Sequence, residues 1–195
     1  MLSRIILFIS LISVCYGIFQ ELTVYSGDDR SGESVSFRQK LSDMTRWQNF
    51  IQESKSYCQI GWWEGYDSKN FEGDVSYRSQ FHPQLTCFNV PFPSNVQSLR
   101  HQGPLDTQYE ALSIYEGSPT EAWSGVELMA TYGSATGIGF VPKGLLISGG
   151  SNWTTYPNED FTGPSTCWLG SNDEDFTKFA LSNTTIVLSM ERGCR

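Results

Sequence analysis

Side chains that could catalyse a reaction are scarce in this chain of 195 residues. It contains two histidines, His82 and His101, and a Ser-His-Asp constellation would need one of them. We expect His82, in Phe-His-Pro, to lie in a loop, and His101 to open a linker. The nucleophile elbow Gly-x-Ser-x-Gly does not occur. Adjacent acids such as Asp28 and Asp29 are common in any acidic chain and do not indicate acid-base chemistry. The sequence therefore predicts a protein that is not an enzyme.

The charge balance limits the classes of partner. Thirteen Lys and Arg face 21 Asp and Glu, which gives a formal net charge of -8 at pH 7. Binding to phosphate backbones requires a basic face, so nucleic acid is excluded and anionic membranes are disfavoured. The chain is 14% aromatic and 17% charged, a composition typical of a folded protein. Its aromatic and β-branched residues, with 18 Gly and 8 Pro, favour strands joined by frequent turns.

The first 17 residues have the layout of a secretory signal peptide. Arg4 precedes an apolar run of about a dozen residues, which is shorter than the roughly 20 that span a membrane. The small residues Cys15 and Gly17 suit a cleavage site after Gly17. We therefore expect residues 1–17 to be removed and the mature protein to be secreted and extracellular, with no membrane span. A buried N-terminal helix or a membrane anchor is the alternative.

Four cysteines remain after that cleavage: Cys58, Cys87, Cys167 and Cys194. Export favours their oxidation, and four cysteines allow three pairings. Pairing Cys58 with Cys87 and Cys167 with Cys194 keeps each disulfide inside one half of the chain. Each would stabilise the fold by about 3 kcal/mol in the chain-entropy model. Four free buried thiols are the alternative, and a zinc site is disfavoured because no Cys-x-x-Cys occurs.

Two glycosylation sequons fit the same extracellular compartment. They are Asn152-Trp-Thr and Asn183-Thr-Thr. We expect N-linked glycans at Asn152 and Asn183.

A fourfold repeat runs through the mature chain. Each copy begins with a Tyr and reaches a Gly after a polar turn, seven residues later in three copies and ten in the third. In three copies an aromatic residue lies two positions before the Gly, whereas the first copy has Arg30 there. The copies are Tyr25 to Gly32; Tyr66 to Gly73 with Phe71; Tyr115 to Gly125 with Trp123; and Tyr156 to Gly163 with Phe161.

The repeat also indicates strands, turns and domains. The segments that lead into the Tyr residues alternate with period two, as half-buried strands do. The Gly would supply a positive φ where the chain turns, and the aromatic could pack on the Tyr ring. Trp63 and Trp153 precede the second and fourth Tyr by three residues, so the copies form two pairs. We expect domains at residues 20–101 and 111–195, joined by a polar linker at 102–110.

These residues resemble the Greek-key motif of the βγ-crystallins, Tyr-x-x-x-x-Phe-x-Gly. The segment from Trp63 to Gly73 looks close to a second motif of that family. Phe37 to Asp43 followed by Trp47, and Ser94 to Arg100, are similar to the lead-out of a first motif and the last strand of a second. The resemblance implies an all-β fold of two βγ-crystallin-like Greek-key β-sandwich domains in tandem. Arg30 and the lengthened third turn depart from the motif, which leaves the geometry of the third turn open.

The resemblance also makes calcium the cofactor to consider. The family site uses a pair of Asn or Asp, two spacers, then Ser or Thr and Ser, completed by backbone carbonyls. The corresponding stretches are degenerate here, at residues 51–56, 93–98, 141–144 and 180–185. We therefore assign no metal ligand and no other cofactor. Calcium stays an alternative through the acidic turns, which otherwise are solvated loops: Asp28-Asp29, residues 158–160 and residues 172–175.

Several aromatic residues are expected in a core or a domain interface rather than in a sugar-binding platform. They are Trp62, Trp63, Phe88, Phe92, Trp168 and Phe179. Neighbouring residues of a strand point to opposite faces of the sheet. We therefore expect one of Trp62 and Trp63 to be partly exposed and to offer a contact surface.

The sequence as a whole predicts a secreted, disulfide-stabilised structural or binding protein of an extracellular matrix, coat or secretion. A hydrophobic patch between the domains would add stability. Its partner would be an extracellular protein or matrix, and the chain would be a monomer or a weak homo-oligomer. One alternative is a secreted defence or effector protein, a toxin component or protease inhibitor, that uses the third turn at residues 116–124. The other is a calcium-dependent binding protein.

Overall fold

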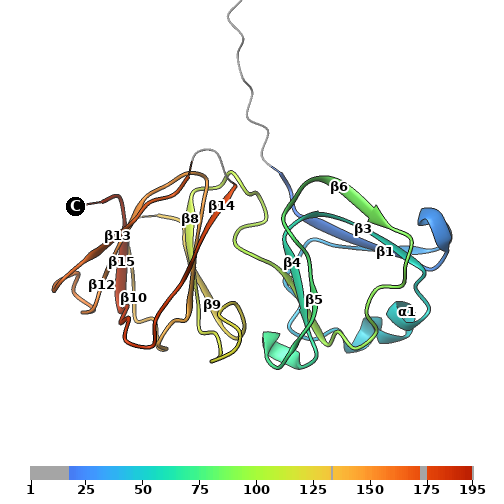
Figure 1. Cartoon of the computed structure of the whole chain (residues 1–195), viewed down its shortest axis with the longest axis horizontal. Coiled ribbons are helices and arrows are strands. Elements are labelled where there is room, and N and C mark those ends of the chain that lie inside the picture. The colour runs from blue at the N-terminus through green and yellow to red at the C-terminus, as the bar shows by residue number, and fades with distance from the viewer. Residues whose placement is uncertain (1–17, 133, 172–174, 195) are drawn as a thin grey trace, which may run out of the picture.

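The computed structural model of the chain describes residues 18–132, 134–171 and 175–194. The predicted signal peptide, at residues 1–17, and residues 172–174 of the last acidic stretch lie outside this description. Within these ranges the chain forms two lobes of β-strands that lie side by side (Figure 1). No helix in the described part of the chain has the length and apolar character needed to cross a membrane.

The first lobe, called the first domain below, holds two antiparallel sheets. Their strand orders are β2-β1-β3-β6 and β5-β4-β7. The strands are β1 (Glu21–Tyr25), β2 (Ser34–Phe37), β3 (Ser56–Gly61), β4 (Trp63–Tyr66), β5 (Val75–Arg78), β6 (His82–Phe88) and β7 (Ser98–His101). Strand β6 of the second repeat joins the sheet of the first repeat. In return, Leu41 of the first repeat forms a bridge with Leu99 on β7. This exchange interlocks the two repeats.

The second lobe, called the second domain below, has the same plan. Its sheets have the orders β14-β11-β8-β9 and β10-β15-β12-β13. The strands are β8 (Ala111–Tyr115), β9 (Glu127–Ala130), β10 (Ser134–Thr136), β11 (Gly144–Ser148), β12 (Trp153–Tyr156), β13 (Thr166–Trp168), β14 (Phe176–Ala180) and β15 (Ser189–Arg192). Here β10 and β14 are the exchanged strands. The predicted fold class, all-β with two Greek-key sandwiches in tandem, is therefore confirmed.

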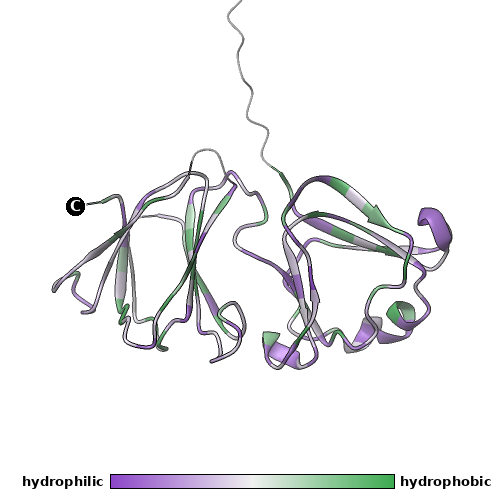
Figure 2. Cartoon of the chain, in the orientation of Figure 1, coloured by the Kyte–Doolittle hydropathy of each residue, from purple (hydrophilic) through white to green (hydrophobic). Residues whose placement is uncertain are grey.

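Four short helical segments interrupt the first domain. They are η1 (Asp28–Arg30), η2 (Thr45–Trp47), α1 (Gln48–Gln52) and η3 (Lys69–Phe71). Figure 2 shows hydrophobic residues along the strands and hydrophilic residues over η1 at the outer end of this domain. Each sandwich therefore keeps its apolar side chains between its sheets and its polar turns outside.

Each sandwich has its own core, and each core contains one of the repeated tryptophans. Trp63 lies among Leu22, Val24, Ile51 and Leu99, and all five are fully buried. Trp153 takes the equivalent place in the second core, beside Leu112, Ile114, Leu145 and Met190. Burying a large apolar side chain contributes about 1.5–3 kcal/mol, so the Trp before the even copies is a principal core residue.

A serine closes the turn of three repeats. Ser98 lies opposite Tyr66 across the sheet, where its hydroxyl donates to the carbonyl of Ser68 (2.7 Å) and accepts the backbone N–H of Phe71 (2.9 Å). Ser56 and Ser189 lie in the same register opposite Tyr25 and Tyr156, and each donates to a carbonyl of its own turn. The Ser therefore fixes the backbone of the turn from the strand that pairs with the Tyr.

The aromatic residue and the Gly complete the turn. The ring of Phe71 packs edge-on against Tyr66, with 6.3 Å between ring centroids. The pairs Tyr115–Trp123 and Tyr156–Phe161 make the same contact at 5.6 and 6.0 Å. Arg30 in the first repeat has no ring, yet its φ of 66° places it in the same left-handed region as Phe71. The departure at Arg30 therefore leaves the course of the backbone unchanged.

Both predicted pairings of cysteines are present as disulfides. Cys58 on β3 and Cys87 on β6 lie opposite one another. This disulfide therefore links β6, the strand from the second repeat, to the sheet of the first repeat. Cys167 on β13 is bonded to Cys194, which follows β15. Each bridge stays within one half of the chain.

Gly73 tests the requirement of the turn for glycine. Its φ is +78°, and a Cβ atom would lie 2.1 Å from Asp67 Oδ1. Gly137 is a matched control, because its φ is +72° but a Cβ there meets nothing within 4 Å. We expect Gly137→Ala to lower the free energy of unfolding by about 1–2 kcal/mol from backbone strain. Gly73→Ala should cost roughly 1–3 kcal/mol more from the overlap, measured by urea unfolding. Equal losses would contradict the steric argument.

Candidate functional site at the domain interface

Five strands in the described part of the chain are buried along their whole length, and four of them belong to the two sheets that lie nearest the other domain. Every residue of β4, β7, β8 and β11 is buried, although a two-layer sandwich covers only one face of each strand. The outward faces of these strands are therefore covered as well. Sheet β5-β4-β7 of the first domain and sheet β14-β11-β8-β9 of the second supply the two faces, and they meet each other. This domain interface is the candidate site.

One part of the interface is aromatic. Trp62 of the first domain packs with Tyr115, Leu146 and Phe176 of the second, and Phe81 and Trp123 lie at the margin. Trp62 is 4% exposed, its ring centroid lies 5.9 Å from that of Trp123, and Lys178 Nζ lies 3.9 Å from it. The expectation that one of Trp62 and Trp63 is partly exposed is therefore wrong. Trp62 does offer a contact surface, but the second domain covers it.

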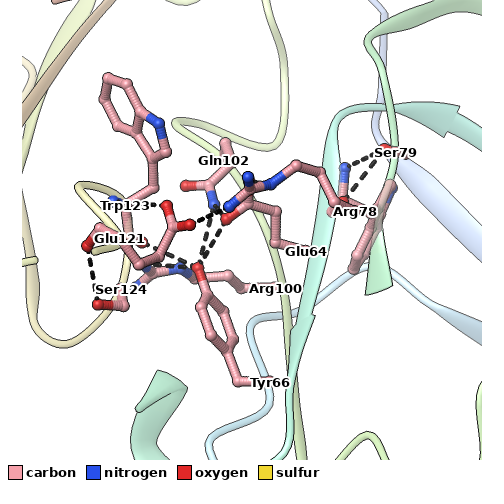
Figure 3. Close-up of polar contacts among 10 residues, drawn as sticks. Glu64, Tyr66, Arg78, Ser79, Arg100, Gln102, Glu121, Trp123 and Ser124 are labelled. Atoms are coloured by element: carbon pink, nitrogen blue, oxygen red, sulfur yellow. Dashed lines mark hydrogen bonds and ion pairs between the residues drawn. The ribbon is translucent and has the colours of Figure 1, made fainter. Parts of the chain in front are cut away.

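The other part is a polar cluster centred on Glu64 (Figure 3). The Glu64 side chain on β4 has no exposed surface and accepts hydrogen bonds from Arg78 Nε (2.9 Å) and Gln102 Nε2 (2.9 Å). The Tyr66 hydroxyl lies 2.8 Å from Glu64 Oε2 and 2.9 Å from the carbonyl of Trp123. Burial raises the pKa of Glu64, and the neighbouring charge of Arg78 opposes this rise. The cluster thus connects β4 to the second domain.

Arg100 is the buried cation of this cluster. Its Nη1 donates to the carbonyl of Gly125 (2.9 Å), and its Nη2 lies 3.4 Å from the Tyr66 hydroxyl. Its guanidinium carbon lies 4.8 Å from the ring centroid of Phe71 and 4.9 Å from that of Tyr115. Within the described part of the chain, its Nε has no hydrogen-bond partner. Aromatic faces and the nearby Glu64 therefore balance this charge in place of a direct carboxylate pair.

The lengthened third turn docks on the first domain. Its Gly125 N–H donates to the carbonyl of Phe71 (2.7 Å), and its Glu121 forms an ion pair with Arg78. Only Pro119 and Thr120 at its tip are exposed within residues 116–124. The segment that the effector alternative needs as a free loop is therefore part of the interface.

The third turn has a second sequence requirement, at Gly144. This residue lies opposite Tyr115, the position that a serine takes in the other repeats. A Cβ at Gly144 would approach the carbonyl oxygen of Ala122 to 2.5 Å and the ring of Trp123 to 2.7 Å. The longer turn therefore needs glycine where the shorter turns use serine.

The two histidines take structural places. His82 is the first residue of β6 rather than part of a loop, and its ring packs against Phe88 at 6.1 Å. His101 ends β7, where it is buried against the ring of Trp63. Burial, together with the charge of Lys40, lowers the pKa of His101 to about 3. His101 is therefore neutral at physiological pH.

Other ionisable groups at the interface are suited to structural roles. Burial raises the pKa of the Tyr66 and Tyr115 hydroxyls, which keeps them protonated as hydrogen-bond donors. Burial lowers the pKa of Lys40, although its ion pair with Glu127 opposes that change. The geometry offers hydrogen bonds and ion pairs between domains rather than a nucleophile beside a general base.

A groove of about 630 Å³ runs along the margin of the interface. The apolar side chains of Phe71, Val126 and Met129 line it together with Lys40 and Glu127. It follows β9, which is the edge strand of its sheet. This groove can accept a mainly apolar group beside one ion pair.

The structure also places the stretches considered for calcium. The hydroxyls of Ser56 and Ser98 hold the turns of their own repeats. In the fourth repeat Ser189 lies opposite Tyr156, so the corresponding stretch is residues 184–189 rather than 180–185. The described residues contain no group of three or more His, Cys, Asp or Glu placed to hold a metal ion.

Both sequon asparagines lie on the surface. Asn152 is exposed, and its Oδ1 accepts the backbone N–H of Gly170 (3.1 Å). Asn183 is exposed as well, and its Oδ1 accepts a hydrogen bond from Lys143 Nζ (2.7 Å).

The principal residues of the interface were not singled out from the sequence. Glu64, Arg78, Arg100 and Gln102 sit on or beside strands, at positions that alternate with core residues. Period-two alternation marks them as outward-facing, and a charged outward residue is usually solvated. The sequence feature that could have revealed the interface is Trp62, a large apolar residue that faces outward on the same side as Glu64.

Comparison with known proteins supports the fold. The structure is similar to that of Geodin, a βγ-crystallin from Geodia cydonium, with a TM-score of 0.55 and 19% identity over 90% of this chain and 99% of Geodin. It also matches the fifth crystallin domain of the non-lens protein Absent in melanoma 1, with 24% identity over 46% of this chain and 95% of that domain. The TM-score of 0.34 is too low to bear on the fold. No family model and no curated protein sequence matches the chain. The chain thus has the βγ-crystallin fold.

Removing Glu64 should weaken the interface. Glu64→Ala leaves Arg78, Gln102 and Tyr66 without their shared acceptor, and we expect a loss of about 2–3 kcal/mol in the free energy of unfolding. Arg38→Gln is the control, because it breaks the ion pair of Arg38 with Glu21 on the surface and should cost less than about 1 kcal/mol. Urea unfolding of both variants measures the difference. A loss at Glu64 no larger than at Arg38 would show that the cluster contributes little.

His101 should make the free energy of unfolding depend on pH below neutrality. Its pKa is about 3 in the folded protein and 6.5 ordinarily, so the unfolded chain binds a proton that the folded chain rejects. The free energy of unfolding should therefore fall as the pH drops from about 6.5 towards 3. Gln at position 101 does not titrate. Between about pH 6.5 and 3 the free energy of unfolding should therefore fall more in the wild type than in His101→Gln. Parallel pH profiles in urea unfolding would disprove the assignment.

Proposed function

We propose that the chain is exported and acts outside the cell as a rigid, disulfide-stabilised structural or binding protein of a matrix, coat or secretion, without catalysis. The observation that carries this proposal is the buried interface, which joins the two sandwiches into one body. Acidic, basic and phenolic groups that catalysis could use are there committed to holding the domains together.

Features beyond the interface support an extracellular role. Two disulfides stabilise the chain, and disulfides persist in oxidising compartments. The predicted signal peptide at residues 1–17 supplies the export route, and Asn152 and Asn183 are exposed for glycan addition. We propose an extracellular protein or matrix as the partner of a monomer or weak homo-oligomer.

The two alternatives have less support. A secreted effector would need a free recognition loop, and the third turn exposes only Pro119 and Thr120. A calcium-dependent binder would need free oxygen ligands in the family stretches, where Ser56 and Ser98 already hold turns. We therefore propose a role that does not depend on a cofactor.

Expression of the full chain in a eukaryotic secretory cell line tests the proposal. We expect the protein in the medium, starting at Ile18, with no reactive thiol and with glycans on both sequons. Intact-mass analysis with and without reductant and glycosidase measures all three properties. Asn152→Gln and Asn183→Gln are matched variants that each remove one sequon, because both asparagines are exposed. Retention inside the cell or four free thiols would overturn the extracellular proposal.

Melting of the same purified protein separates the alternatives. We expect one cooperative calorimetric transition for both domains, with the same Tm in calcium and in chelator. Two separate transitions would contradict the single rigid body. A rise in Tm with calcium would favour the calcium-dependent binder, because a ligand that binds the folded state raises Tm.

A further inference from the structure

The first described residues pair with the segment between the domains. Gln20 N–H donates to the carbonyl of Leu105 (3.0 Å), and Thr107 N–H donates to the carbonyl of Ile18 (3.1 Å). Phe19 and Asp106 form an antiparallel bridge between them. Residues 18–20 and 105–107 are therefore a short antiparallel ladder, and the predicted linker is held along this stretch.

The Gln20 side chain anchors this ladder. It is fully buried, and its Nε2 donates to the carbonyls of Gln102 (2.7 Å) and Pro104 (2.8 Å). Its Oε1 accepts the backbone N–H of Trp62 (2.7 Å). The contacts of Gln20 thus fix where the preceding residue, and with it Ile18, enters the fold.

A chain of hydrogen bonds leads from Ile18 to the second domain. The backbone nitrogen of Ile18 lies 3.4 Å from Thr107 Oγ1, and the Thr107 hydroxyl donates to Asp175 Oδ1 (3.0 Å). Gln108 Nε2 donates to the same carboxylate oxygen (2.9 Å). Thr107 is fully buried, and Asp175 directly precedes β14. The start of the chain, the linker and the second domain therefore meet at one acidic side chain.

We propose that cleavage between Gly17 and Ile18 creates a lock, in which the new N-terminal ammonium of Ile18 donates to Thr107 Oγ1 and pairs through it with the Asp175 carboxylate. This inference rests on the export proposed above. In the cleavage a protease adds water across the peptide bond. The C–N bond breaks, Gly17 leaves as a carboxylate, and Ile18 keeps the amine.

The charge created at Ile18 suits its surroundings. A free α-amine has an ordinary pKa of about 7.7–8.0 and is mostly protonated at neutral pH. Hydrogen bonds that involve an ionised group are about twice as strong as those between neutral groups. Among the described residues, Asp175 is the acid that contacts Thr107, so the ammonium adds a charge of the opposite sign next to it. A retained Gly17 would move the charge away from Thr107.

A double-mutant cycle tests the lock. The protein is refolded and oxidised with its first residue at Ile18 or at Gly17, each released from a fusion by a protease that leaves no added residue. We expect the Ile18 form to melt about 2–4 °C higher, the shift that a charge-assisted hydrogen bond gives in a protein of this size. In Asp175→Asn this difference should fall below half of its wild-type value. Asp28→Asn, which removes an exposed acid on η1, should leave the difference intact.

The reactivity of the α-amine provides a second readout that does not depend on stability. With Asp175 present, acetylation of the Ile18 amine by acetic anhydride at pH 7 should be several-fold slower than in Asp175→Asn. Equal melting of the Ile18 and Gly17 forms, or equal acetylation rates in the two Ile18 proteins, would overturn the lock. Retention of the full chain inside the cell would instead overturn the export proposal. The two failures can be told apart, because the comparison of the refolded Ile18 and Gly17 forms does not require export.

Discussion

The two sandwiches meet through sheet faces that carry charged side chains. The need to give these buried charges hydrogen-bond partners is the main constraint on the structure. Glu64 and Arg100 are both removed from water, which is costly unless donors and acceptors replace the lost hydration. One of those partners comes from the other domain, because the carbonyl of Gly125 accepts from Arg100. The carbonyl of Trp123 accepts from Tyr66, whose hydroxyl also lies against Glu64. Hydrogen-bond geometry thus fixes how the domains sit on one another more narrowly than apolar contact alone could.

The aromatic side of the interface complements this polar side. Among the described residues, Arg100 Nε, Gln102 Oε1 and Ser113 Oγ have no hydrogen-bond partner, so the polar network is incomplete. Trp62 and its neighbours bury apolar surface beside it and supply the favourable part of the contact. The hydrophobic patch expected between the domains is therefore present, but it covers only part of the interface.

Local chemistry explains most of what could be predicted. The Tyr-to-Gly spacing describes a turn whose residues are close in sequence, and strand alternation identifies which residues face the core of each sandwich. The disulfide between Cys58 and Cys87 follows from strands that lie within one domain. The role of Trp62 could not be predicted in this way, because the surface that covers it lies more than 50 residues further along the chain. Gly144 was also missed, since its need for glycine appears only once the third turn is seen to fold over it.

The sequence by itself determined the repeated unit, its turns and the two sandwiches, because each depends on short-range spacing and on one buried face per strand. It favoured one pairing of the cysteines, and the structure decided that pairing. Only the tertiary structure decided that the opposite faces are buried too. A charged side chain such as Glu64 has the same periodic position whether it faces water or another domain. The two cases differ only in whether a complementary surface supplies its partners, and that surface exists only after both domains have folded.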